Sequence, residues 1–152
     1  MADTVSPERR SAIMANIRSR NTTPELKVRR YLHSAGLRFR LHKSGLPGKP
    51  DLVFPSRRIC VFVHGCFWHG CERCVDGTRA VKSNSAFWIE KVRKNRERDA
   101  RNESALEADG WKVLTVWECQ LQSPVTLKRL ATRIKNAPKR QAVRTPPANR
   151  AA

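Results

Sequence analysis

The sequence has little negative charge and no long apolar run. Among its 152 residues, 13 Asp and Glu stand against 31 Lys and Arg, so the formal net charge is +18. No segment approaches the roughly 20 apolar residues of a membrane-spanning helix, and the start, Met1-Ala2-Asp3-Thr4, lacks the apolar stretch of a signal peptide. We expect a cytoplasmic protein without a membrane partner, whose positive field favours DNA or RNA. A basic surface kept only for solubility is the alternative.

The sequence also lacks the signs of a disulfide framework. In a cytoplasmic chain, five cysteines indicate metal binding or plain burial. Cys71 and Cys74 form a CxxC pair, a common half-site for zinc, and Cys119 follows a predicted strand. The residues nearby offer Cys66 or His69 as a fourth ligand. A redox dithiol is less favoured, because this pair lies in a histidine-rich loop instead of opening a helix after a strand.

Apolar periodicity and capping residues predict one α/β domain. The apolar run Ile59–Val63 suggests a central strand that is covered on both faces. Together the elements form a mixed sheet flanked by helices. We expect a folded domain over 1–135 and a basic, disordered tail over 136–152. The predicted elements are helices from Ser6-Pro7 and from Thr23-Pro24 to Gly36, strands over 37–42, 51–54 and 59–63, a functional loop over 64–86, a helix over 87–109, a strand over 111–117, and a helix from Ser123-Pro124 to about Lys135.

Two neighbouring strands bring an acid and a histidine to one edge of this sheet. Asp51 begins one strand and His64 ends the next, one hairpin away. An aspartate there can hold magnesium, which prefers oxygen ligands, although Asp51 could also be a simple turn residue. His64 and His69 can transfer protons near neutral pH, with zinc binding or a structural role as the alternative. Glu25, in the first turn of a helix, is ordinary there because it meets the positive end of the helix dipole.

Several motifs resemble the very short patch repair (Vsr) endonucleases, a family with a restriction-endonuclease-like fold. The resemblance runs from about Arg9 to Leu121, with the motifs in the same order and at matching spacing. The motifs are Val63-His64-Gly65-Cys66-Phe67-Trp68-His69, Leu46-Pro47-Gly48-Lys49-Pro50-Asp51, Phe87-Trp88-Ile89-Glu90-Lys91 with Asn95 and Glu97-Arg98-Asp99, Gly110-Trp111-Lys112-Val113, and Val116-Trp117-Glu118-Cys119.

The resemblance implies a role for each residue at the site. Asp51 and the main-chain carbonyl of Val63 would bind Mg²⁺, His69 would activate the attacking water, His64 would assist at the phosphate, and Glu25 would support the metal-bound water. Zinc would be structural, with Asp99 as the fourth ligand beside Cys71, Cys74 and Cys119. The aromatic side chains would wedge into the base stack beside a mismatch; these are Phe67, Trp68 and Trp88.

The function implied is nicking of the T-containing strand at T:G mismatches that arise from 5-methylcytosine deamination. The implied partners are double-stranded DNA, mismatch-repair proteins and a companion cytosine methyltransferase, for a monomer in a bacterial cytoplasm, associated with the nucleoid. The chain departs from the family at Val63, where Thr is commoner, and in the spacing of Cys71 and Cys74. A nuclease of the same fold with another target, restriction-like or toxin-like, and a non-catalytic, zinc-stabilised DNA-binding module are the alternatives.

Overall fold

The computed structural model describes residues 6–9, 21–74 and 84–139. Most of the predicted first helix, over 10–20, and most of the predicted tail, over 140–152, lie outside the described residues. In the described part, no helix is long and apolar enough to cross a membrane.

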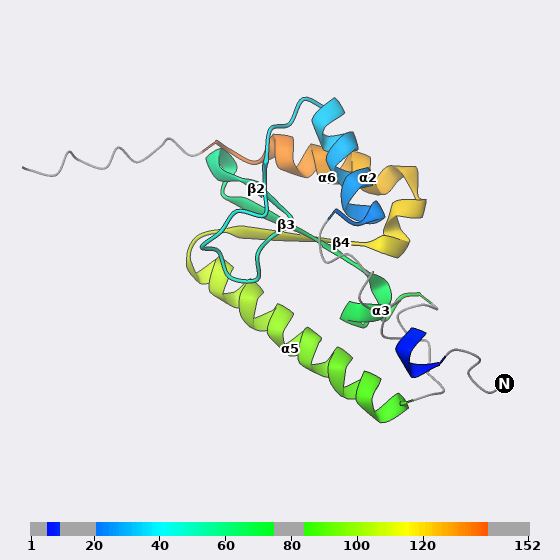
Figure 1. Cartoon of the computed structure of the whole chain (residues 1–152). Helices are drawn as coiled ribbons and strands as arrows, with labels where there is room; N and C mark the ends of the chain where they lie inside the picture. The colour runs from blue at the N-terminus through cyan, green and yellow to red at the C-terminus, as the bar shows by residue number, and fades with distance from the viewer. Residues whose placement is uncertain (1–5, 10–20, 75–83, 140–152) are drawn as a thin grey trace, which may run out of the picture.

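A four-stranded mixed sheet forms the centre of the fold, as predicted (Figure 1). Its strands are β1 (Arg40–Leu41), β2 (Leu52–Phe54), β3 (Ile59–His64) and β4 (Lys112–Trp117), in the order β1-β2-β3-β4. The first three form an antiparallel meander, and β4 pairs parallel to β3. Strand β3 therefore has a neighbour on each side, and five of its six residues are buried, which confirms the predicted central strand.

Strand β1 is shorter than the predicted strand over 37–42, for two local reasons. The Leu37 N–H bonds back to the Leu32 carbonyl at 3.0 Å, so this residue still caps the preceding helix. His42 has a φ of 45°, outside the extended region, and this ends the strand. Between β2 and β3, the short helix η1 (Pro55–Arg57) and the left-handed Arg58 make the predicted turn.

Helices cover both faces of the sheet. Helices α2 (Thr23–Ser34) and α6 (Pro124–Asn136) lie on one face, where they share the larger apolar core with alternate strand residues such as Leu52 and Val61. Helix α5 (Ser85–Ala108) crosses the other face, and its Leu106 packs against Val53, Cys60 and Trp111. Strand neighbours point to opposite faces, so each strand supplies both cores.

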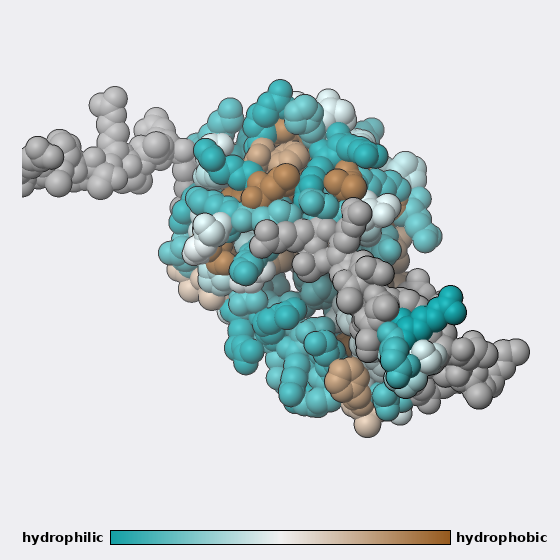
Figure 2. Space-filling view, viewed as in Figure 1, coloured by the Kyte–Doolittle hydropathy of each residue, from teal (hydrophilic) through white to brown (hydrophobic). Residues whose placement is uncertain are grey.

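Helix α5 reaches beyond the sheet, and this extension frames the site. Of its 24 residues only Leu106 is buried, so most of the helix carries charged side chains toward solvent, as the largely hydrophilic surface in Figure 2 shows. The predicted loop over 64–86 starts differently from expectation, because Cys66–His69 form the short helix α3 directly after β3. The Gly70 N–H bonds the Cys66 carbonyl and ends this helix with a φ of 66°. Residues 75–83 lie outside the described part.

Close packing holds α3 against α5. A side chain at Gly70 would meet Val92 Cγ1 at 2.7 Å, so only glycine allows this approach. The Asn95 amide also donates to the Trp68 carbonyl at 2.9 Å. The residues between β3 and the CxxC pair are therefore fixed by the long helix, beyond the end of the sheet.

Candidate active site and metal centres

Two carboxyl groups from different elements meet beside the end of β3. Asp51 directly precedes β2, and its Oδ2 accepts a hydrogen bond from the Val63 N–H at 2.7 Å. Glu25, in the first turn of α2, is 3% exposed and hydrogen-bonded to Asp51. The first-turn position of Glu25 agrees with an ordinary dipole role, but its burial against Asp51 makes it part of the site.

Asp51 and Glu25 form an anionic pair that is costly when both are ionised. Burial, together with the charge and hydrogen bond of Glu25, raises the pKa of Asp51 to about 7, although the Val63 N–H and the Arg29 guanidinium each lower it. Either a proton or a cation relieves this repulsion. Two carboxylates are the oxygen ligands that Mg²⁺ prefers, so the residues present fit a magnesium ion.

A pair of histidines begins at the residue after Val63. His64, the last residue of β3, stacks on His69 of α3, with ring centroids 3.9 Å apart and planes within 3°. Burial lowers the pKa of His64 to about 4, and the neighbouring His69 lowers it as well. His64 is therefore neutral near pH 7, and its buried Nδ1 has no hydrogen-bond partner in the described part of the chain.

Asp99 of α5 orients the second histidine. Its Oδ2 lies 2.5 Å from His69 Nδ1. Burial disfavours the charged carboxylate, but the hydrogen bond and charge of His69 outweigh burial and lower the pKa of Asp99. The other ring nitrogen, Nε2, is thus left to act as a proton acceptor, an arrangement typical of a general base with an orienting acid.

Four cysteines, from α3, the segment after it and the segment after β4, form a second cluster. Cys66, Cys71, Cys74 and Cys119 place their sulfur atoms within 4.8 Å of one another. The Cys71 and Cys119 sulfurs are 3.8 Å apart, too far for a disulfide. Four thiolates around a tetrahedral zinc, with Zn–S bonds of about 2.3 Å, would lie roughly 3.8 Å apart. The cluster therefore fits a structural zinc ion, and its location differs from that of the histidine cluster.

This placement differs from the expected zinc ligands at one residue. Cys71, Cys74 and Cys119 come together as expected, but Cys66 completes the cluster, and Asp99 lies in the separate group with His64 and His69. The position of Asp99 on α5 does not by itself show whether its side chain reaches the cysteines or the histidines. Cys66, one of the alternatives from the sequence, is brought in because it opens α3 and the Cys119 N–H donates to its sulfur at 3.3 Å.

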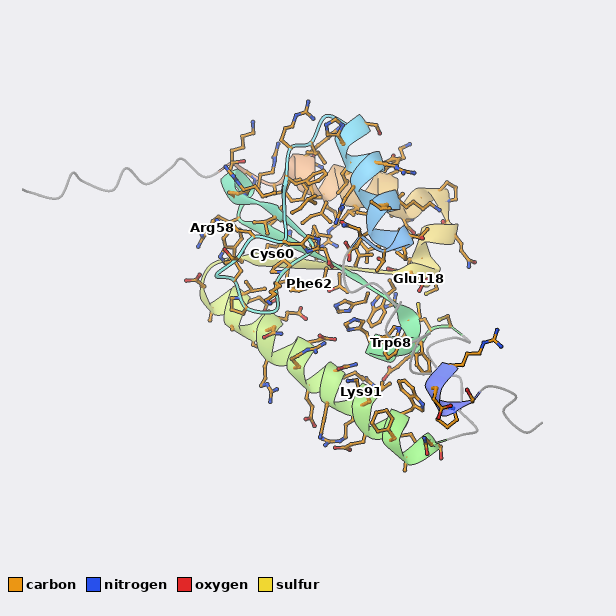
Figure 3. All side chains as sticks on the ribbon, in the orientation of Figure 1. Arg58, Cys60, Phe62, Trp68, Lys91 and Glu118 are labelled. Carbon is orange, nitrogen blue, oxygen red and sulfur yellow. The ribbon has the colours of Figure 1, made fainter. Side chains whose placement is uncertain are left out.

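The predicted wedge residues form an aromatic cluster outside both apolar cores. Trp68 lies 5.4 Å from both Phe67 and Trp88, measured between ring centroids. All three side chains are half-buried, whereas Phe87 beside them is 59% exposed. Figure 3 shows Trp68 beyond the end of the sheet, near α5, while Arg58 and Cys60 mark the opposite end of β3.

One signal was overlooked in the sequence. Arg29 and His42 lie against Glu25, with Arg29 Nη2 at 2.9 Å and His42 Nε2 at 3.7 Å from its Oε2. Arg29 follows Glu25 by one helical turn, so this ion pair could have been found from spacing. The contact of His42 depends on tertiary structure.

Comparison with known proteins finds DNA mismatch endonucleases and nicking enzymes. The family model described as "DNA mismatch endonuclease Vsr" matches residues 2–75. The type II nicking enzyme V.XorIIP of Xanthomonas oryzae pv. oryzae is 52% identical over 136 residues, covering 90% of this chain and 96% of that protein. V.NmeAIP of Neisseria meningitidis, also named a type II nicking enzyme, is 43% identical, covering 90% and 99%. DNA mismatch endonuclease Vsr of Escherichia coli is 42% identical, covering 80% and 77%.

Proposed function

The chain belongs to the Vsr family of DNA mismatch endonucleases, and on this premise we propose that it nicks one strand of duplex DNA beside a thymine mispaired with guanine. The relatives named nicking enzymes support single-strand cutting. The observation that carries the proposal is that two groups are placed at the same end of β3: the Asp51–Glu25 pair, which is bonded to the Val63 N–H, and the His64, His69 and Asp99 group, which begins at the next residue. A binding module needs neither group.

The chemistry follows from these two groups. Asp51, with the Val63 carbonyl, would hold Mg²⁺, which when bound polarises the scissile phosphate and stabilises the leaving oxygen. His69, oriented by Asp99, takes the proton of the attacking water. The neutral His64 ring stacks on the His69 ring. Glu25 would support the metal-bound water beside Asp51. Hydrolysis leaves a 5′-phosphate and a 3′-hydroxyl, as the family resemblance implies.

The aromatic cluster supports a preference for mismatches. Inserting an aromatic ring into the base stack costs a few kcal/mol of unstacking, and a mismatched step costs least. Trp68 and its neighbours Phe67 and Trp88 present half-exposed rings that recover part of that cost by stacking. We therefore assign them the wedge, and 5-methylcytosine deamination is the source of the T:G mismatch.

The zinc ion, in our proposal, is structural and bound by Cys66, Cys71, Cys74 and Cys119. It would tie α3 and the CxxC segment to the end of β4, and so fix the histidines and aromatic rings that this segment carries. We place the catalytic domain, restriction-endonuclease-like in fold, within residues 1–135, with the basic segment 136–152 adding salt-sensitive affinity for DNA. The protein works as a monomer in the cytoplasm, and mismatch-repair proteins are its expected partners.

The proposal is tested by strand-specific nicking. End-labelled duplexes with one T:G mismatch in varied contexts, and fully paired controls, are incubated with Mg²⁺ and the wild-type protein. Cutting should occur only on the mismatched T strand and should be lost in Asp51→Ala but kept in Glu103→Ala, an exposed acid of α5. Equal cutting of paired DNA would leave a nuclease with another target. DNA binding without any cutting would leave the binding module.

A further inference from the structure

The Glu25 carboxylate is clamped through one of its two oxygens. Its Oε2 accepts from the Asn21 N–H at 3.0 Å and from Arg29 Nη2 at 2.9 Å, and the His42 ring nitrogen Nε2 lies 3.7 Å away. None of these contacts uses Oε1. The hydrogen bonds from Asn21 and Arg29 therefore fix the rotation of the carboxylate and leave its second oxygen for the site.

Arg29 is the centre of this clamp. Its side chain is 12% exposed, and besides Glu25 it donates through Nη1 to the Asn21 side chain at 2.7 Å. Its Nη2 also lies 3.0 Å from His42 Nε2. A guanidinium has only donors, so the His42 nitrogen must accept, and His42 holds Arg29 as Arg29 holds Glu25.

His42 joins the clamp to the other carboxylate. Its backbone N–H donates to the Asp51 carbonyl at 3.4 Å, directly after the pairing of Leu41 with Leu52. One residue thus contacts Asp51 through its backbone and Arg29 through its ring. The relative position of Glu25 on α2 and Asp51 before β2 is fixed by this link.

Fold stability alone gives a poor account of this arrangement. Arg29 Nε is buried without a hydrogen-bond partner in the described residues. A buried ion pair contributes little to folding compared with apolar residues of the same size, and an unsatisfied donor adds a cost. Because burying Arg29 in this way costs folding free energy, a role in the site explains its position better than a role in the core.

We propose that Arg29, held by His42, is a positioning residue that orients Glu25 toward Asp51 and the metal-bound water. The inference rests on the proposed metal-dependent function and adds two residues to it. Partners that orient the residues around a metal change metal affinity or activity by about 10- to 100-fold when they are removed.

The test holds charge constant and changes geometry. Arg29→Lys keeps the positive charge but cannot bond Glu25, Asn21 and His42 together. We expect kcat at saturating Mg²⁺ to fall about 10- to 100-fold with KM for the mismatched duplex unchanged. In DNA-free protein, we expect the Mg²⁺ concentration at half of the Mg²⁺-induced shift in Tm to rise about tenfold. Arg30→Lys, an exposed arginine of the same helix, is the matched control and should match the wild type.

Three further variants separate the possible roles. In a Glu25→Gln background, Arg29→Lys should lower kcat no further, because it acts through Glu25. His42→Ala should lower kcat, and His42→Gln, which restores an acceptor for Arg29, should recover it.

Each outcome bears on the inference. Full activity and an unchanged Mg²⁺ response in Arg29→Lys would overturn it, and so would a lower Tm with both readouts intact, which indicates a structural role. Independent, additive effects of Arg29→Lys and Glu25→Gln would also overturn it. A wild-type protein that neither responds to Mg²⁺ nor nicks DNA would remove the proposed function itself, and the inference with it.

Discussion

Replacing Asp51 by Asn should stabilise the Mg²⁺-free protein, and increasingly so as the pH rises. In the folded state, burial and Glu25 raise the pKa of this carboxyl from 3.8 to about 7. A group whose pKa is raised on folding contributes stability that is present below the unfolded pKa and is lost as the pH rises through the folded pKa. The relevant window is therefore about pH 4 to pH 7. Asn keeps the shape and cannot ionise, so the variant avoids this loss.

The magnitude follows from the shift in pKa. A difference of about 3 units, at about 1.4 kcal/mol each, gives a penalty of about 4 kcal/mol when Asp51 is ionised in the folded state. By pH 5 the unfolded carboxyl is already ionised, and roughly 2 kcal/mol of that penalty is present. Between pH 5 and pH 8, the free energy of unfolding of the variant should therefore gain about 2 to 3 kcal/mol relative to the wild type. This is a large share of a typical stability of about 5–15 kcal/mol.

The assay is urea unfolding followed by tryptophan fluorescence at pH 5, 6.5 and 8. The buffer contains no Mg²⁺ and no chelator, so that bound zinc is retained. Burial lowers the pKa of His64 to about 4, so His64 contributes stability above pH 6.5 that is lost as the pH falls. Because both proteins contain His64, its effect cancels in the difference between them. A difference that stays constant from pH 5 to pH 8 would refute the reasoning, and Mg²⁺ at pH 8 should stabilise only the wild type.

Three further predictions concern zinc, the histidine and the wedge. The purified wild-type protein should contain one zinc ion. The Cys66→Ala variant should lose this zinc, whereas Cys60→Ala, which changes a fully buried cysteine in the core, should keep it. Equal zinc contents in the two variants would contradict the ligand assignment. Asp99→Asn should lower kcat about 10²- to 10⁴-fold with zinc retained, because the general base loses its orienting acid, and loss of zinc on metal analysis would instead make Asp99 a ligand. Trp68→Ala should reduce nicking of mismatched duplex roughly 5- to 150-fold, the loss of 1–3 kcal/mol of stacking, with cooperative unfolding preserved; full activity would remove Trp68 from the wedge.

The sequence predicted most of the fold because local signals and periodicity agree there. The apolar run of β3, the Thr22 cap of α2, the Pro124 that opens α6 and the Gly110 that follows α5 each act within a few residues, so the elements and their order could be read directly. Hairpin connections then determined that β1, β2 and β3 form a meander. One exception is β1, which is shorter than expected because Leu37 bonds back to α2. Another is α3, a short helix at the start of the predicted loop over 64–86.

For the candidate site, the sequence determined the residue types and the segment that carries them. Asp51 and His64 lie at the adjoining ends of neighbouring strands, so their proximity follows from the hairpin alone. The CxxC pair and Cys119 are likewise candidate metal ligands by type and spacing, and their sulfurs come together in the structure. The family resemblance added Glu25 and the aromatic rings, which no local pattern identifies.

Only the tertiary structure decided which side chains share a site. Asp99 lies on a long helix whose charged residues repeat on every face, and the packing of α3 against α5 at Gly70 brings it to His69 instead of the cysteines. Cys66 joins the thiol cluster because α3 turns its sulfur toward Cys119. His42 reaches Arg29 only because β1 ends beside α2. These contacts join residues that are distant in sequence, so their geometry depends on how the helices pack on the sheet.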